Sequence, residues 1–216
     1  VSWAGATGAT IDARCLPQTK CVGHRVPMQE HSRRTMDLAI LHWMQSTLAN
    51  PFFDTIFPLI TKLGEHGAIW LVIAIILICT KKNRVWGVTM IVAIGCAWLI
   101  GDQILKDIIA RPRPFIEDPT LTLLIAPPDG YSLPSGHSSS SFCAATILSF
   151  AYLKKGWKAG AWVLAVLIAF SRVYLCVHNP SDVLAGAAFG VLIALIAVFF
   201  AKKFLAYWNA GKHQTV

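Results

Sequence analysis

The sequence predicts an all-α fold, a polytopic membrane helix bundle of about five transmembrane helices preceded by N-terminal interfacial helices. Of the 216 residues, 55% are hydrophobic and only 14% are charged, whereas a soluble domain usually carries about 25% charged residues. Apolar runs that can cross a bilayer, at roughly 18 residues or more, occur several times. Membrane helices bury their surfaces against one another, so a chain of this length suits one compact domain.

The N-terminal segment, residues 1–35, is rich in small, polar and basic residues and has no apolar core of the kind that a secretory signal needs. We expect a flexible tail there. Met36 followed by Asp37 would make a natural start, which leaves open that residues 1–35 are not native. A membrane domain is expected over residues 36–210, and a short C-terminal tail over residues 211–216.

Two cysteines lie in the N-terminal tail. Cys15 and Cys21 can pair if the tail faces an oxidising compartment. A zinc site that adds His24 and His31 is the weaker alternative, because the spacing matches no familiar zinc pattern.

Two short amphipathic segments precede the first span. Residues 37–48 have helical periodicity with a polar face, which predicts a helix lying in the membrane interface. Asn50 and Pro51 break this pattern, and residues 52–63 form a second amphipathic segment.

Five apolar segments then alternate through the bilayer. They cover approximately residues 67–80, 85–109, 136–153, 160–177 and 179–203. In the last of them, Gly186 and Gly190 have a small-xxx-small spacing, which predicts a close-packed helix face. Ser138 to Ser141, at the start of the third span, are expected to serve packing and hydrogen bonding.

Three basic clusters fall on one side of the membrane when these spans alternate. They are Lys81, Lys82 and Arg84, then Lys154, Lys155 and Lys158, and finally Lys202 and Lys203. The positive-inside rule makes this side cytoplasmic. The basic N-terminal tail would then lie outside, against the rule, unless the tail is not native or residues 52–63 dip further into the membrane.

The opposite side receives three clusters of polar residues, and charged residues at membrane depth are functional candidates by default. One cluster pairs His178 with Asp182, which falls in the first turn of the last span. Asn179 suits the N-cap of that helix and Pro180 its first position. A carboxylate placed there can keep one imidazole nitrogen protonated and leave the other free to attack.

The other two clusters supply an anion site. The Pro134–His137 run predicts a turn that opens into a helix, whose first amides bind an anion, and His137 is placed to donate a proton. Lys106, Arg113 and Arg172 add three positive charges that match a phosphate. The set describes phosphoryl transfer through a phosphohistidine. Because no acidic cluster suited to magnesium accompanies it, we expect no metal and no cofactor.

Two further charged residues have open roles. Arg111 is a candidate for either a headgroup contact or an outer cation. Asp102 lies one helical turn before Lys106 and can pair with it, either to orient the amine or as a purely structural ion pair.

The motifs resemble those of a known family. Three stretches look like the three signature motifs of the type 2 phosphatidic acid phosphatase superfamily. They are the spacing Lys106-x6-Arg113-Pro114, the run Pro134-Ser135-Gly136-His137 and the series Ser171-Arg172-x5-His178-x3-Asp182. All signature residues are present in the expected order. The resemblance implies that His178 is the nucleophile, Asp182 its orienting partner, and His137 the group that protonates the leaving group and later activates water. It also implies a set of phosphate ligands, namely Lys106, Arg113, Arg172, Ser135 and the Gly136 amide.

The resemblance extends to short bacterial members, which include undecaprenyl diphosphate phosphatases. It implies an integral membrane lipid phosphatase in a bacterial plasma membrane. The alternation of the spans predicts an extracytoplasmic site, and this position together with the resemblance favours undecaprenyl diphosphate as the substrate. The first alternative is a phosphatidylglycerophosphate or phosphatidate phosphatase, and the next a phosphate-transferring enzyme that acts on lipid A. From a different class, a non-catalytic anion-binding or scaffold protein would need the cations but not the His178–Asp182 pair. The net charge of +8 does not predict a nucleic-acid partner, since the basic residues form short clusters and not one stripe. The partners expected are the lipid substrate and membrane lipids.

Overall fold

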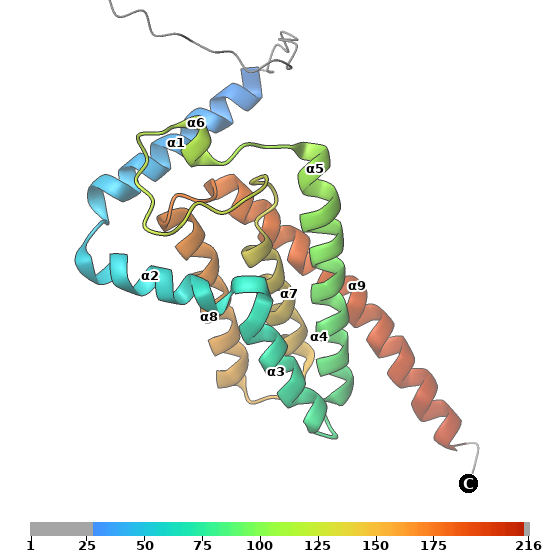
Figure 1. The fold of residues 1–216 in the computed structure, drawn as a ribbon. Helices are drawn as coiled ribbons and strands as arrows, with labels where there is room; N and C mark the ends of the chain where they lie inside the picture. Colours follow the sequence, from blue (N-terminus) through green and yellow to red (C-terminus); the bar gives the residue numbers. More distant parts are fainter. Residues whose placement is uncertain (1–27, 214–216) are drawn as a thin grey trace, which may run out of the picture.

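The computed structural model describes residues 28–213, and these residues form helices and connecting loops without a strand (Figure 1). The prediction of an all-α membrane bundle is confirmed. The elements, in chain order, are α1 (Met28–Thr47), α2 (Pro51–Leu63), η1 (Glu65–Gly67), α3 (Ala68–Cys79), α4 (Arg84–Ala97), η2 (Trp98–Leu105), α5 (Lys106–Ile109), α6 (Pro114–Glu117), α7 (Gly136–Phe150), α8 (Lys155–Tyr174) and α9 (Pro180–His213).

All five segments expected as spans are largely helical, with bounds within about five residues of the predicted ones except at the end of the last helix, which continues to His213. Among the described residues, three stretches are long and apolar enough to cross a membrane: Arg84–Glu117, α8 and α9. The pair α2 and α3, bent by 45° at η1, makes a fourth if it counts as one span. With 12 and 15 residues, α3 and α7 are individually too short for a hydrocarbon core of about 30 Å. By length and composition, the described residues therefore contain three or four candidate membrane spans, whereas the sequence suggested about five.

The central helix of the bundle is α7, which packs against α4, α8 and α9. Its four serines, Ser138 to Ser141, are buried, and Ser141 accepts a 2.9 Å hydrogen bond from the Trp70 indole. The α9 helix approaches α7 at its glycines. A Cβ on Gly186 would lie 2.5 Å from the Ser135 carbonyl oxygen, and one on Gly190 would clash with the Ser139 backbone. The predictions of a packing role for the serines and of a close-packed glycine face are confirmed.

The three basic clusters lie together at one end of the bundle. The Lys82 ammonium lies 4.8 Å from the Tyr152 ring centroid, and the Tyr152 N–H donates to Asn83 Oδ1 at 2.8 Å. On α9, the Lys202 ammonium lies 4.5 Å from the Phe150 ring centroid. The polar link between α8 and α9 lies at the opposite end (Figure 1), as the alternation of the spans requires.

The terminal helices extend into both of the segments expected as tails. Helix α1 already begins at Met28, before the expected boundary at residue 36, and α9 continues to His213, into the expected C-terminal tail. Side-chain contacts tie α1 to the rest of the chain, among them Arg34 to Glu117 at 3.3 Å. Residues 1–27, with Cys15, Cys21 and His24, lie outside the described part, as does the side chain of His31, so the expectations for a tail, a disulfide and a zinc site there stay predictions.

Helix α2 packs against α8. The ring centroids of Phe57 and Tyr174 are 4.6 Å apart, and the Tyr174 hydroxyl donates to Asp54 Oδ1 at 2.6 Å. These contacts, with the bent α2–α3 pair, favour the alternative in which residues 52–63 enter the bundle more deeply than an interfacial helix would.

Candidate active site

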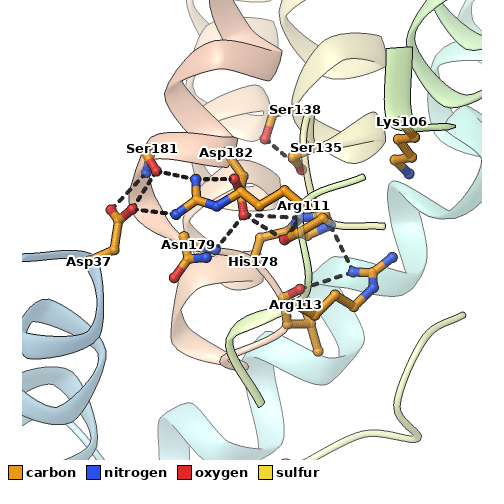
Figure 2. A network of polar contacts seen from close by, with 12 residues as sticks. Asp37, Lys106, Arg111, Arg113, Ser135, Ser138, His178, Asn179, Ser181 and Asp182 are labelled. Carbon is orange, nitrogen blue, oxygen red and sulfur yellow. Dashed lines mark hydrogen bonds and ion pairs between the residues drawn. The ribbon is translucent and has the colours of Figure 1, made fainter. Parts of the chain in front are cut away.

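Several of the polar residues predicted to carry the chemistry gather around the link between α8 and α9, at the end of the bundle opposite the basic clusters (Figure 1). Figure 2 shows Arg113, His178 and Asp182 in this network. His178 lies in the short link between α8 and α9, and Asp182 lies in the first turn of α9. Both side chains are buried. The expected N-cap is reversed: the Asn179 amide side chain has no hydrogen-bond partner among the described residues, whereas its backbone N–H donates to Asp182 Oδ2 at 2.9 Å.

The pairing of His178 with Asp182 is indirect. Nδ1 of His178 lies 3.9 Å from Asp182 Oδ2, which is too long for a hydrogen bond. The Ser132 hydroxyl lies between them, 3.3 Å from Nδ1, and donates to Oδ2 at 2.5 Å. Because that hydroxyl donates to the carboxylate, its lone pair faces the imidazole. This arrangement assigns the ring proton to Nδ1 and the free lone pair to Nε2.

The guanidinium of Arg113 lies next to Nε2 of His178. Nη1 of Arg113 lies 3.3 Å from His178 Nε2 and also donates to the Val177 carbonyl at 2.9 Å. Two more carbonyls, of Asp129 and Gly130, fix the rest of the guanidinium. The Arg113 side chain is therefore held rigidly where a phosphoryl group bound to Nε2 would carry its negative charge.

Arg172 is contacted by helix α2, which was not expected to contribute to the site. Its Nη1 donates to Thr61 Oγ1 on α2 at 2.6 Å, while its Nε is buried without a partner within the described part of the chain. The turn after α2 also borders the site, since a Cβ on Gly64 would lie 2.9 Å from His137 Cδ2. Thr61 was missed because α2 was expected in the membrane interface, and a threonine in an amphipathic segment gives no signal of its own.

The first two motifs meet through Asp102. The Lys106 ammonium forms an ion pair with Asp102 Oδ1 one helical turn away, which confirms the expected pairing. The carboxylate also abuts the start of α7, where a Cβ on Gly136 would lie 2.7 Å from Asp102 Oδ2. Gly136 therefore permits the close approach that brings Lys106 to the first turn of α7. Next to it, the buried Ser135 accepts a 3.1 Å hydrogen bond from Ser138.

Arg111 is an outer cation of the cluster. Its Nη1 donates to Asp182 Oδ1 at 2.6 Å and its Nη2 to Asp37 Oδ2 at 2.9 Å. Figure 2 shows the guanidinium between the two carboxylates. Of the two roles left open for Arg111, the geometry favours the outer cation over the headgroup contact.

The electrostatics of the site favour a neutral imidazole. Burial, followed by the positive charges of Arg172 and Arg113, holds the pKa of His178 well below its ordinary value of 6.5. The ring is then unprotonated at Nε2 near neutral pH, as a nitrogen nucleophile must be.

An apolar cavity lies apart from this cluster. The cavity, of about 830 Å³, lies between α4 and α9, and its lining extends from Arg84 and Phe204, near the basic end of the bundle, to Ile100 in η2. Apart from Arg84, the lining is almost wholly apolar, which suits contact with lipid chains and no chemistry.

Comparison with known proteins adds independent findings. A family model described as the PAP2 superfamily matches residues 86–205. The undecaprenyl-diphosphatase of Sulfolobus acidocaldarius is 34% identical over 147 residues, which cover 67% of this chain and 70% of that protein. The crystal structure of Aquifex aeolicus LpxE has a TM-score of 0.66 and 29% identity, with 76% of this chain and 94% of that chain covered. A transmembrane PAP2-type phosphatidylglycerolphosphate phosphatase from Bacillus subtilis also has a TM-score of 0.66, with 27% identity, 80% of this chain and 87% of that chain covered.

Proposed function

The chain belongs to the PAP2 superfamily, as a multi-pass membrane lipid phosphatase, and we propose that it hydrolyses undecaprenyl diphosphate through a phosphohistidine on His178. The observation that carries this proposal is the orientation of His178. Its Nδ1 is held through Ser132 to Asp182, and its Nε2 faces Arg113.

In the first step, Nε2 of His178 attacks the terminal phosphorus. The new P–N bond forms as the bond between the terminal phosphorus and the bridging oxygen breaks, and the electron pair of that bond stays on this oxygen, which leaves as part of undecaprenyl monophosphate. His137, at the start of α7, donates a proton to this oxygen. The ring of the phosphohistidine becomes positive, and its Nδ1–H remains bonded through Ser132 to the Asp182 carboxylate.

In the second step, water attacks the phosphohistidine. His137 accepts a proton from the water, the P–N bond breaks, and its electron pair returns to Nε2. Lys106, Arg113 and Arg172 lower the energy of the transition state in both steps by opposing the charge of the phosphoryl oxygens. The unpartnered Nε of Arg172 is the donor that a phosphate oxygen would satisfy, because buried polar groups normally have a partner.

The substrate assignment rests on two supports. A relative, 70% of which this chain covers, is named undecaprenyl-diphosphatase. The α8–α9 link lies at the end of the bundle opposite the basic clusters, and the positive-inside rule supports an extracytoplasmic position for that end. The second candidate is phosphatidylglycerophosphate, which a solved structure of the same fold is named for.

The test is phosphate release by detergent-purified protein in excess EDTA. Undecaprenyl diphosphate, phosphatidylglycerophosphate and phosphatidate are compared at equal surface concentration, with His178→Ala as the control. We expect a strong preference for the diphosphate and no release by the variant. A preference for a glycerolipid would overturn the substrate assignment alone. Release from none of the three would overturn the catalytic proposal and favour a non-catalytic anion-binding protein.

A further inference from the structure

Arg111 links the N-terminal helix to the carboxylate behind the proposed nucleophile. On one side Nη1 donates to Asp182 of α9, and on the other Nη2 donates to Asp37 of α1. Ser181 closes the link. Its hydroxyl accepts from Arg111 Nη1 at 2.7 Å and donates to Asp37, and its backbone N–H donates to Asp37 Oδ1 at 3.1 Å. The network thereby joins Arg111 to Asp37, 74 positions before it in the sequence, and to Asp182, 71 positions after it.

The charges explain why this link matters. Asp182 is fully buried and Asp37 is 5% exposed, and a buried carboxylate without a positive partner is strongly unfavourable. Arg111 is the cation that hydrogen-bonds to both. The Ser132 hydroxyl and the backbone N–H of Asn179 donate to the other oxygen of Asp182. The carboxylate is therefore fixed from three directions, and its orientation sets that of Ser132 and hence of the His178 ring.

The same contacts argue against a role for Arg111 as a phosphate ligand. Both of its Nη atoms are directed at carboxylates and at Ser181. Arg172 differs, because its Nε is buried without a partner among the described residues. Arg113 differs as well, because it contacts Nε2 of His178.

We propose that Arg111, anchored by Asp37 of α1, is a positioning residue that fixes Asp182, so that the N-terminal helix is a structural part of the active site. The proposal rests on the proposed function, since it assigns work to a residue that acts through the His178 nucleophile. It predicts that loss of the anchor slows turnover and leaves phosphate binding unchanged.

The experiment compares Asp37→Asn, Arg111→Gln and the double variant with the wild type. His42→Gln is the matched control, because His42 lies on the same helix and contacts Asp118 at 2.8 Å, away from Asp182. The readouts are kcat on undecaprenyl diphosphate, the inhibition constant of inorganic phosphate as product, and the Tm in detergent. The Tm identifies any variant that has lost its fold. Asp37→Asn keeps the shape of the side chain, so we expect it to lower the Tm least.

We expect each single variant to lower kcat, by up to roughly 100-fold as a small misplacement can, with the phosphate inhibition constant within about twofold of the wild type. The double variant should be little worse than Arg111→Gln, because both changes act through one link. A weaker inhibition by phosphate in Arg111→Gln would make Arg111 a phosphate ligand and overturn the proposal. Wild-type kcat in both single variants would also overturn it, while the proposed function would stand. Absence of turnover in the wild type would overturn both.

Discussion

Ser132 donates a 2.5 Å hydrogen bond to Oδ2 of Asp182, and this hydroxyl occupies the place where a direct contact of the carboxylate with the His178 ring was expected. The imidazole is 3.9 Å from the carboxylate and 3.3 Å from the hydroxyl. The carboxylate of Asp182 is therefore linked to the ring through one intervening O–H group, and the loop before α7 contributes a residue to the candidate site.

The Ser132→Ala variant tests this arrangement. It removes the group that accepts the Nδ1 proton, so the ring loses its fixed orientation. We expect kcat to fall by roughly 10- to 100-fold, with a smaller change in KM, because loss of an outer partner misplaces the reacting atom without removing it. Steady-state kinetics on undecaprenyl diphosphate checks this. Unchanged kcat in a folded Ser132→Ala protein would show that Asp182 acts on the ring without the hydroxyl.

The Thr61→Val variant tests the support that α2 gives to Arg172. The change keeps the shape of the side chain and removes the acceptor for Arg172 Nη1. We expect a rise in KM and a loss of about 1 to 3 kcal/mol in the free energy of unfolding, since a buried donor loses its partner. Thr55→Val on the same helix is the control, because the Thr55 hydroxyl bonds only within α2 and is exposed. Equal effects of the two changes would contradict a specific role for Thr61.

The Gly186→Ala variant tests the contact between α7 and α9 that sets the site. The added Cβ would lie 2.5 Å from the Ser135 carbonyl, and overpacking of this kind costs about 1 to 3 kcal/mol. We expect a lower Tm together with lower activity. For Gly160→Ala, where a Cβ meets nothing within 4 Å, we expect an unchanged or higher Tm, because alanine favours the helix. A Gly186→Ala protein as stable and active as Gly160→Ala would show that the two helices are not closely packed there.

The pH dependence follows from the environment of His178. Because the pKa of His178 in the folded protein lies well below 6.5, the nucleophile stays neutral as the pH falls through 6.5. We expect the acidic limb of the kcat/KM profile to have its midpoint below 6.5, at the same pH for undecaprenyl diphosphate and phosphatidate. The same shift makes the folded state lose stability as the pH drops below 6.5, because the unfolded histidine then binds a proton that the folded one does not. A midpoint at or above 6.5 with both substrates would contradict this environment.

Much of the fold was predictable because helix boundaries in this chain carry local signals. Lys81 and Lys82, the Lys154–Lys155 pair and Asn179-Pro180 mark ends of apolar runs, and the structure has helices that begin or end beside each of them. The start of α1 was missed, since residues 28–35 are polar and their helix is continuous with a segment that packs on the rest of the chain through Asp37. The sequence also did not show that α7 is too short to span the membrane alone. An apolar run looks the same whether lipid or neighbouring helices cover the helix.

The candidate site was predictable to the extent that its residues are charged and lie in an apolar setting. The cost of charge at membrane depth singles out Lys106, Arg113 and Arg172, and the structure brings them to one end of the bundle with His178. The residues that orient them were not predictable in this way. Ser132 and Thr61 are short, neutral side chains, and their partners are 46 and 111 positions away in sequence. Only the packing of α2 and the loop before α7 reveals these contacts.

The most direct test of the central claim is to trap the phosphoenzyme. Undecaprenyl diphosphate labelled in its terminal phosphate is mixed with the detergent-purified wild type, quenched with denaturant at alkaline pH within one turnover, and digested for mapping of the label. The account predicts label on the peptide that contains His178, attached to Nε2, and none in a folded His178→Ala protein. Label on another residue, or turnover that persists in His178→Ala, would contradict it.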